Sequence, residues 1–347
     1  MSPLREPKSP SKSLPETRVD GPLLDVRDLV VEYATEKGSV KAVDGVSFTL
    51  ERGEFLGIVG ESGCGKSTLL FGIAQLLSAP AGVTGGQVLF QGTDLVPMKE
   101  KEIRPIRWAG ISVVMQSAMN ALNPVKTIGA QYRDVLRAHS FDLDIPARSR
   151  EVLELVGVDP VHLSSYPHQL SGGMRQRAMI AMALLLTPDL IVMDEPTSAL
   201  DVVAQRSLMV QIKELQKELG FAIIFVTHDM SLVSHFSDRL IVMYGGQIAE
   251  VGETRTVFDT PLHPYSKGLL EAFPSIRGPK VPLLGIPGTP PDLATPPPGC
   301  RFAPRCPVAM PSCTEDGPDL YDVDSVLVRC LLHEPGRTST SKEDVPA

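Results

Sequence analysis

The order of hydrophobic and polar positions along the chain predicts two kinds of strand. Residues 23–33 (LLDVRDLVVEY) and 46–50 (VSFTL) alternate between apolar and polar side chains, as half-buried antiparallel strands do. Residues 55–60 (FLGIVG), 189–196 (DLIVMDEP) and 222–229 (AIIFVTHD) instead contain continuous apolar runs. Such runs indicate strands that are buried on both faces, which is typical of parallel sheets.

The remaining patterned segments predict helices and a hairpin around these strands. Residues 207–219 (SLMVQIKELQKEL) have helical spacing with charged side chains four positions apart. Residues 239–252 (RLIVMYGGQIAEVG) read as a hairpin about a Gly-Gly turn. Strands alternate with helices between about 55 and 230, so the expected fold class is α/β, with a mostly parallel sheet covered by helices.

Composition limits where this domain can work. Of the 347 residues, 43% are hydrophobic and 21% are charged, which suits a globular protein with a full core. The formal net charge of −8 argues against nucleic acid as a partner. The longest apolar stretches, such as residues 179–186, are too short to span a bilayer, and the N-terminus has no apolar signal segment. We therefore expect a cytoplasmic chain that reaches a membrane only through another protein.

Proline and glycine mark a change in the chain past residue 260. Residues 278–299 are rich in both and cannot continue a helix or a sheet. Four of the five cysteines follow within 31 residues, at Cys300, Cys306, Cys313 and Cys330. We expect a disordered tail over 1–21, the α/β domain over 22–260, a Pro-rich extension with the cysteine cluster over 261–335, and a disordered tail over 336–347.

A glycine-rich segment after the first buried strand predicts a phosphate site. Residues 60–68 (GESGCGKST) fit the pattern G-x-x-x-x-G-K-[ST] of a P-loop, in the strand–loop–helix context that it requires. Backbone N–H groups of such a loop turn toward phosphates, Lys66 reaches them, and the Ser67 hydroxyl can bind Mg²⁺. The alternative is a glycine-rich turn without a ligand. The candidate residues are Gly60, Glu61, Ser62, Gly63, Cys64, Gly65, Lys66, Ser67 and Thr68.

Polar side chains that follow the other buried strands are candidates for the chemistry. Asp194 and Glu195 end one strand, where Asp194 can hold Mg²⁺ and Glu195 can polarise an attacking water. Alone, such a pair is more often a helix N-cap. His228 ends another strand, where ligand sites gather in parallel sheets, although a lone histidine is more often a packed or surface residue. Gln116 has a similar position and could bind Mg²⁺ or cap a turn.

A second segment suited to an anion lies a hundred residues after the P-loop. Residues 170–177 (LSGGMRQR) open an apolar helix over about 173–186. The free N–H groups at a helix N-terminus, here at Ser171, Gly172 and Gly173, attract negative charge. The alternative is that these residues only cap the helix.

Together these motifs resemble the ATP-binding cassette (ABC) ATPases over about residues 22–255. The P-loop resembles Walker A, Gln116 the Q-loop, LSGGMRQR the signature, residues 190–195 Walker B, residues 198–201 the D-loop, and His228 the H-loop. Tyr33 matches the aromatic residue that stacks on adenine. The resemblance implies a P-loop cassette with a mostly parallel core sheet, an N-terminal antiparallel β-subdomain and a helical signature subdomain.

The family's mechanism gives each motif a role. Two ATPase domains pack head to tail, so that Ser171, Gly172 and Gly173 of one contact the γ-phosphate bound by Walker A of the other. The resemblance implies that Ser67, Gln116 and Asp194 hold Mg²⁺, that Glu195 is the base, and that His228 holds the γ-phosphate. Lys66 neutralises charge on the transferred phosphoryl group. ATP hydrolysis then separates the two domains.

The C-terminal segments narrow the resemblance to one branch. Residues 263–274 (HPYSKGLLEAFP) and 299–313 (GCRFAPRCPVAMPSC) resemble ATPase subunits of oligopeptide, dipeptide and nickel importers. Met174 resembles the first, D-type ATPase of the pair. The implied partners are a paralogous second ATPase (or a second copy), two transmembrane permeases and, indirectly, an extracytoplasmic solute-binding protein, with the chain peripheral on the cytoplasmic face.

The solute stays open at this stage. Residues 117–124 (SAMNALNP) depart from the acidic-Pro-Met-Thr-Ser-Leu-Asn-Pro form of peptide systems and resemble sugar-transporting members. Peptides are therefore the first expectation, with oligosaccharides or nickel as the alternative and an exporter ATPase as a weaker one.

The cysteines are expected to serve two different purposes. The four C-terminal cysteines lack the paired C-x₂-C spacing of zinc modules, and the resemblance favours a structural [4Fe–4S] cluster, with zinc, no metal or disulfides as alternatives. Cys64 lies near a helix N-terminus and Lys66, both of which lower a thiol pKa, so we expect it to be sensitive to alkylation. Its alternative role is a small filler.

Overall fold

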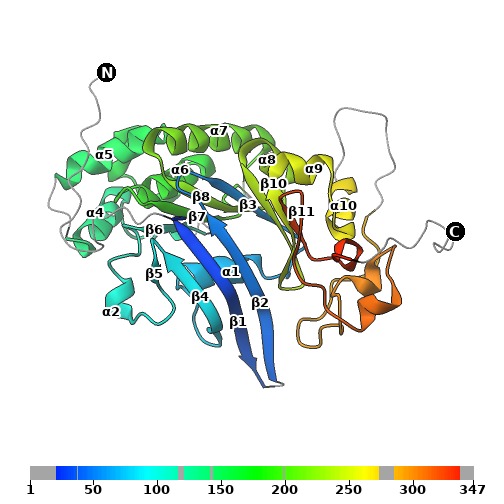
Figure 1. Cartoon of the computed structure of the whole chain (residues 1–347). Helices are drawn as coiled ribbons and strands as arrows, with labels where there is room; N and C mark the ends of the chain where they lie inside the picture. Colours follow the sequence, from blue (N-terminus) through cyan, green and yellow to red (C-terminus); the bar gives the residue numbers. More distant parts are fainter. Residues whose placement is uncertain are drawn as a thin grey trace. The chain divides into compact units, whose positions relative to one another are not determined.

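The computed structural model describes residues 21–36, 38–115, 121–140, 144–197, 200–272 and 285–336. The chain divides into two compact units. Figure 1 labels most of their helices and strands. One, the P-loop unit, comprises residues 23–96 and 222–347. The other, the signature unit, comprises residues 97–221 with the N-terminal segment up to Pro22. Both expected tails fall almost wholly outside the described residues, and the expected boundary near 260 stays a prediction.

An antiparallel sheet forms the first layer of the P-loop unit. Its strands are β1 (Leu24–Thr35), β2 (Gly38–Leu50), β4 (Ala81–Phe90) and β5 (Thr93–Asp94), in the order β2-β1-β4-β5. Leu24 lies opposite Leu50 on one side and Phe90 on the other, and all three are fully buried. The predicted antiparallel pair is confirmed, although β2 begins eight residues before the predicted segment at 46, because its first half pairs with the far end of β1.

A second layer of the same unit consists, within the described residues, of six strands. They are β3 (Phe55–Val59), β8 (Ala222–Val226), β9 (Arg239–Tyr244), β10 (Gln247–Glu253), β11 (Tyr321–Val323) and β12 (Val326–Val328). β3 pairs in parallel with β8 and β9, and every residue of β3 and β8 is buried, as their apolar runs predicted. β9 and β10 form the predicted hairpin. β12 then pairs with β10, so the C-terminal extension continues this sheet.

Helices of the P-loop unit pack on both layers, the first helix on the antiparallel sheet and the later helices on the second layer. They are α1 (Lys66–Ile73), α8 (Met230–Phe236), α9 (Thr254–Asp259) and α10 (Pro264–Glu271), with short 3-10 turns η3 (Ala303–Arg305), η4 (Pro311–Thr314) and η5 (Leu331–His333). Gly57 in β3 shows how close the packing is. A Cβ atom there would lie 2.9 Å from Cγ1 of Val233 in α8, so a larger residue would force the helix away from the strand.

The signature unit combines a parallel strand pair with helices. β6 (Ile111–Val114) pairs with β7 (Leu190–Asp194). The helices are α2 (Glu100–Ile103), α4 (Ile128–Ala138), α5 (Ile145–Leu155), α6 (Gly172–Ala183) and α7 (Val202–Leu219), with 3-10 turns η1 (Pro160–Ser164) and η2 (Pro167–Gln169). α7 starts five residues before the predicted helix, where Asp201 caps it. α6 ends at Ala183 and not at 186, because Arg148 binds the carbonyl groups of Leu184 and Leu185.

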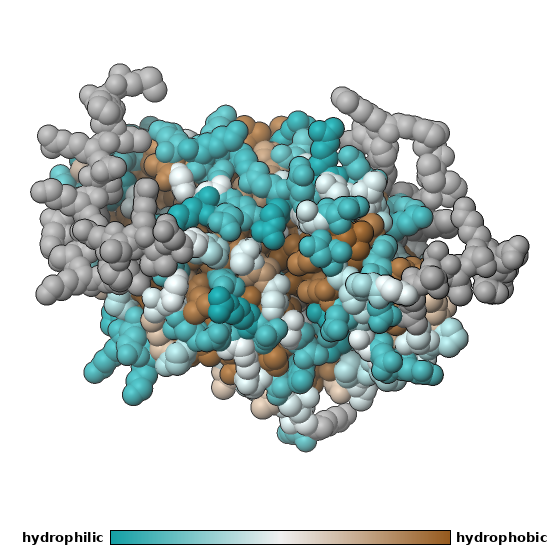
Figure 2. All heavy atoms as spheres, in the orientation of Figure 1, coloured by the Kyte–Doolittle hydropathy of each residue, from teal (hydrophilic) through white to brown (hydrophobic). Residues whose placement is uncertain are grey.

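The surface is mixed in polarity. Figure 2 shows hydrophilic side chains over much of the visible face, with hydrophobic ones between them. Within the described ranges, no helix has both the length and the apolar character that crossing a bilayer requires.

Candidate functional site

The P-loop connects β3 to α1 through several glycines, two of which leave no room for a side chain. Gly60 and Gly65 have φ values of 150° and 100°. A Cβ atom would lie 2.2 Å from the Met243 carbonyl oxygen at Gly60 and 2.1 Å from the Ala42 carbonyl oxygen at Gly65. Both positions therefore need glycine for conformation and for space. Such a loop turns its N–H groups inward at the start of a helix, where anions are stabilised.

Lys66 lies inside this loop. Its ammonium group donates to the carbonyl oxygens of Gly60 and Glu61, at 2.8 and 2.9 Å, and the residue is only 8% exposed. The hydroxyl groups of Tyr33 and Thr68 are 3.1 Å apart, so the predicted adenine-stacking residue lies beside the predicted phosphate site. The structure thus brings the predicted residues of β1, the P-loop and α1 together.

The environment of Cys64 differs from the one expected for a thiol with a lowered pKa. The residue is 5% exposed, and burial raises the pKa of its thiol above the ordinary value, while the Lys66 ammonium opposes this rise only in part. The expected lowering of the pKa is therefore wrong, because the proximity of one cation does not offset the loss of water around the thiolate.

Glu61 contacts the C-terminal extension. Its carboxylate accepts hydrogen bonds from both terminal nitrogens of Arg305, at 2.6 and 2.9 Å. Its backbone N–H donates to the Tyr265 hydroxyl group, at 2.8 Å. Sequence reasoning placed Glu61 at the phosphates and missed both partners. The sequence contains both partners, in the segment HPY (263–265) and in the arginine beside Cys306, but nothing in either segment indicates that it contacts Glu61.

Hydrogen bonds within and next to the HPY segment (263–265) fix the position of Tyr265. Nδ1 of His263 accepts from the Tyr265 N–H at 2.9 Å and caps α10, which begins at Pro264. Burial lowers the pKa of His263 to about 3, so the ring is neutral at ordinary pH and Nδ1 can accept. The buried Glu250 carboxylate accepts from the N–H groups of Leu262 and His263, both at 2.9 Å, and fixes the entry to the helix.

His228 lies just after β8 and is exposed. The next residue, Asp229, caps α8 by accepting from the N–H groups of Ser231 and Leu232. This cap was not predicted, although Asp followed by an apolar helix is a usual signal for one. His228 belongs to the P-loop unit, as do Tyr33 and the P-loop itself.

The predicted carboxylates belong to the signature unit. Asp194 is the last residue of β7 and is 3% exposed. Glu195 follows with φ of 45°, a left-handed conformation that is costly for a residue other than glycine. Such strain is common at functional sites. Gln116 and the D-loop residues Ser198 and Ala199 lie outside the described residues.

The signature segment has the geometry of a helix N-terminus. Ser171 is exposed, and its hydroxyl oxygen accepts from the Met174 N–H at 3.3 Å. Gly172 and Gly173 form the first turn of α6 and are half-buried. This arrangement caps the helix, as the alternative interpretation holds, and it also leaves glycine N–H groups at an accessible helix end, as anion binding requires.

The four C-terminal cysteines are free thiols, of which Cys313 and Cys330 are buried and Cys300 and Cys306 are half-buried. The Cys300 N–H donates to the Cys313 carbonyl at 2.8 Å. Burial, together with a smaller contribution from the neighbouring thiols, raises the pKa of Cys330 to about 11. Within the described ranges, however, no three His, Cys, Asp or Glu side chains form a group that could hold a metal ion. The expected iron–sulfur site therefore has a suitable set of soft donors but no formed ligand geometry.

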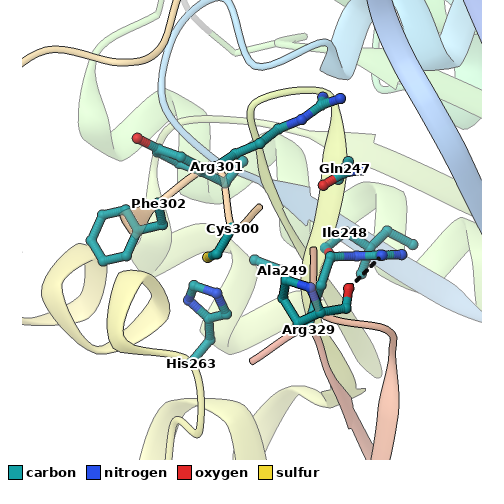
Figure 3. A pocket seen from close by; sticks show the side chains of 10 residues that line it. Gln247, Ile248, Ala249, His263, Cys300, Arg301, Phe302 and Arg329 are labelled. Carbon is teal, nitrogen blue, oxygen red and sulfur yellow. Dashed lines mark hydrogen bonds between the residues drawn. The ribbon is translucent and has the colours of Figure 1, made fainter. Parts of the chain in front are cut away.

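A small cavity lies beside Cys300. Figure 3 shows the Cys300 sulfur directed toward the His263 ring, while the Arg301 side chain extends away from it. The cavity measures about 20 Å³, which is room for about one water molecule. It cannot hold a nucleotide or a peptide.

Comparisons with known proteins bear on this site directly. The family model for ABC transporters matches residues 43–198, and the model for the C-terminal region of oligopeptide/dipeptide transporters matches residues 249–313. The dipeptide transport ATP-binding protein DppD of Bacillus subtilis (strain 168) is 46% identical over 319 residues, which are 90% of this chain and 95% of that protein. The chain belongs to the ABC transporter ATP-binding proteins.

Further relatives agree with this membership. The oligopeptide transport ATP-binding protein OppD of Salmonella typhimurium (strain LT2) is 44% identical, over 88% of this chain and 94% of its own. The dimeric structure of MJ0796, a bacterial ABC transporter cassette, is 28% identical with a TM-score of 0.61, over 67% of this chain and 99% of its own. The predicted cassette fold is confirmed, and the chain is an ABC-type ATPase that binds ATP.

Proposed function

We propose that this ABC ATPase powers an importer of dipeptides, oligopeptides or related solutes. The observation that carries the proposal is the match of residues 249–313 to the C-terminal region of oligopeptide/dipeptide transporters. DppD and OppD relatives at 40–46% identity support it, because their names describe dipeptide and oligopeptide transport. Oligosaccharide, nickel or export systems are the alternatives, and none of these names supports them.

The site residues divide the work of ATP hydrolysis. We assign the triphosphate to the P-loop, where Lys66 offsets the charge that develops on the transferred phosphoryl group. Glu195 accepts a proton from the attacking water, and His228 orients the γ-phosphate. Ser67, Asp194 and Gln116 would hold Mg²⁺, which supplies further positive charge when bound. The buried position of Lys66 and the strained backbone at Glu195 support these roles.

Completion of the site requires a second ATPase. We propose that Ser171, Gly172 and Gly173 contact the γ-phosphate bound by the partner's P-loop, and that the partner is a paralogous ATPase. The exposed helix N-terminus of α6 supports this role, since its N–H groups and dipole attract phosphate. Two permeases would hold the pair at the cytoplasmic face of the membrane, and a solute-binding protein would act through them.

The cysteines have a separate role in this proposal. Cys300, Cys306, Cys313 and Cys330 are proposed to hold a [4Fe–4S] cluster that stabilises the extension. Four free thiols that are buried or half-buried, with soft sulfur donors, support it. Iron and labile-sulfide analysis of protein purified without oxygen tests the idea. Iron-free protein that is fully folded would contradict it.

Transport by the assembled complex tests the main proposal. The chain would be purified with its partner ATPase and permeases, reconstituted in vesicles with the binding protein, and supplied with labelled peptide, oligosaccharide or Ni²⁺. We expect ATP-dependent uptake of peptide, and loss of that uptake in Lys66→Ala. ATP-dependent uptake of an oligosaccharide or Ni²⁺ without peptide would overturn the assignment of cargo.

A further inference from the structure

Two residues of the C-terminal extension, Arg305 and Tyr265, form hydrogen bonds with Glu61 of the P-loop. Arg305 binds the Glu61 carboxylate with two hydrogen bonds, of 2.6 and 2.9 Å, across 244 positions of sequence. Tyr265 accepts the Glu61 N–H across 204 positions. Paired bonds between a guanidinium and a carboxylate fix both distance and orientation. The side chain and the amide of Glu61 are thus both fixed by the extension.

The same residue is bonded to the phosphate-site lysine. The Glu61 carbonyl oxygen accepts from the Lys66 ammonium at 2.9 Å, next to the Gly60 carbonyl at 2.8 Å. A shift of Glu61 therefore moves an acceptor of Lys66. Since the Lys66 ammonium is only effective within hydrogen-bond reach of the phosphates, the placement of Glu61 matters for nucleotide binding.

Arg305 is itself held rigidly. Its Nε donates to the Pro287 carbonyl at 2.8 Å, and Nη1 also donates to the Tyr244 hydroxyl at 3.2 Å. The residue is 8% exposed. A guanidinium with its N–H groups directed at fixed acceptors has little freedom to turn elsewhere, so it transmits the position of the extension to Glu61.

Arg301, four residues earlier, binds residues next to the loop. It donates to the Gly245 carbonyl and to the Asp44 carboxylate, and Figure 3 shows its side chain extending away from Cys300. The adjacent Gly246 N–H donates to the Cys64 carbonyl at 3.0 Å. The segment 300–306 therefore contacts the P-loop through Arg305 and supports the turn beside it through Arg301.

We propose that Arg305 is a positioning residue for ATP, which by holding Glu61 keeps the P-loop in its nucleotide-binding conformation. The extension thereby sets the affinity of the cassette for nucleotide. This inference rests on the assignment of residues 60–68 to the ATP phosphates. It requires no metal at the cysteines.

Equilibrium binding of ATP to the full-length chain tests this. Arg305→Met removes the two bonds to Glu61 at similar side-chain length, and we expect the Kd for MgATP to rise about tenfold, which corresponds to about 1.4 kcal/mol of binding free energy. Arg305→Lys keeps the charge but loses the paired geometry, so its Kd should lie between the Kd of the wild type and that of Arg305→Met. Arg255→Met, at an exposed arginine of the same unit, is the control and should bind like wild type.

A double-mutant cycle separates positioning from general stability. Glu61→Gln should raise the Kd by a similar factor, and the double variant should be no weaker than either single one if Arg305 acts through Glu61. Thermal melting identifies the temperature at which each variant is folded. A folded Arg305→Met or Glu61→Gln with a Kd within twofold of wild type, or factors that multiply in the double variant, would overturn the inference. Unchanged binding in Lys66→Ala would instead overturn the assignment of the phosphate site.

Discussion

Single residues of the P-loop are governed by burial and by backbone space. Lys66 and Cys64 are neighbours, at 3.7 Å between Nζ and Sγ, yet the ammonium does not make the thiol acidic. Around them, Gly60 and Gly65 lie against backbone carbonyl groups that leave no space for a Cβ atom. The chemistry of the loop therefore depends on burial and on neighbouring backbone groups as much as on its own residues.

Alkylation of Cys64 should be slow. Because its pKa is raised by burial, less thiolate is present at a given pH than in an ordinary thiol, and the labelling rate should keep rising at a pH where an ordinary thiol has levelled off. Iodoacetamide labelling of the folded full-length chain, followed by peptide mass spectrometry at several pH values, measures this. The urea-unfolded chain is the control. Labelling of folded Cys64 as fast as in the unfolded chain would contradict the prediction.

Two glycines of the loop provide a matched pair of substitutions. Gly65→Ala places a Cβ atom against the Ala42 carbonyl and should abolish ATP binding, because the loop must move. Gly63→Ala meets nothing within 4 Å, so only its φ of 79° opposes the change, at a cost of about 1–2 kcal/mol. ATP binding and urea unfolding of both variants are the measurements. Equal effects would show that the space around Gly65 is not decisive.

Helices and strands in this chain are fixed partly by their own residues and partly by contacts from elsewhere. Ser171, Asp201 and Asp229 each cap the helix that follows them, which is local information. The C-terminus of α6 depends instead on Arg148 of α5, whose Nε and Nη2 donate to the carbonyls of Leu185 and Leu184 at 2.9 and 2.8 Å. A buried cation at this end also interacts favourably with the negative end of the helix dipole.

Removal of that contact should destabilise the signature unit. In Arg148→Met two buried carbonyl groups lose their charged donor, and we expect the free energy of unfolding to fall by about 2 kcal/mol. Unfolding in urea can be followed by the fluorescence of Trp108, the single tryptophan. Its Nε1 donates to the carbonyl of Met182 in α6, so it reports on the helix that Arg148 contacts. Arg150→Met, on the same helix but exposed, should change stability by less than about 0.5 kcal/mol. An equal loss in both variants would refute the role of Arg148.

The elements themselves were largely predictable from the chain. Continuous apolar runs found β3, β7 and β8, because strands buried on both faces need apolar residues at every position. The residues at which the helices and strands begin and end were less predictable. The first half of β2 lacks strong alternation and is a strand because β1 pairs with it, and α6 ends where Arg148 binds it.

The whole molecule is an ABC-type ATPase, and the residues proposed to act in catalysis belong to both units. The P-loop and His228 belong to one unit, and the signature, Asp194 and Glu195 to the other. Under the proposed mechanism, the assembled dimer hydrolyses ATP only when the partner's signature completes the site. Binding and hydrolysis should therefore be separable by mutation.

Glu195→Gln is expected to separate them. The amide keeps the size of the side chain but cannot accept a proton from water, so ATP binding should remain while turnover is abolished and the closed dimer accumulates. Phosphate release by the assembled complex and size-exclusion chromatography with ATP are the measurements. Lys66→Ala is the contrasting variant and should lose binding and dimer together. Turnover of Glu195→Gln at the wild-type rate would refute the assignment of the base.

The sequence by itself determined the cassette, its order of motifs and the residue types of its site. Each of these depends on neighbours within a few positions, where strand, glycine loop and helix propensities act. Only the tertiary structure decided that Glu61 faces Arg305, that His263 is neutral, and that Cys64 is not acidic. Partners 244 positions apart and the loss of water around a side chain are consequences of packing, which no local pattern encodes.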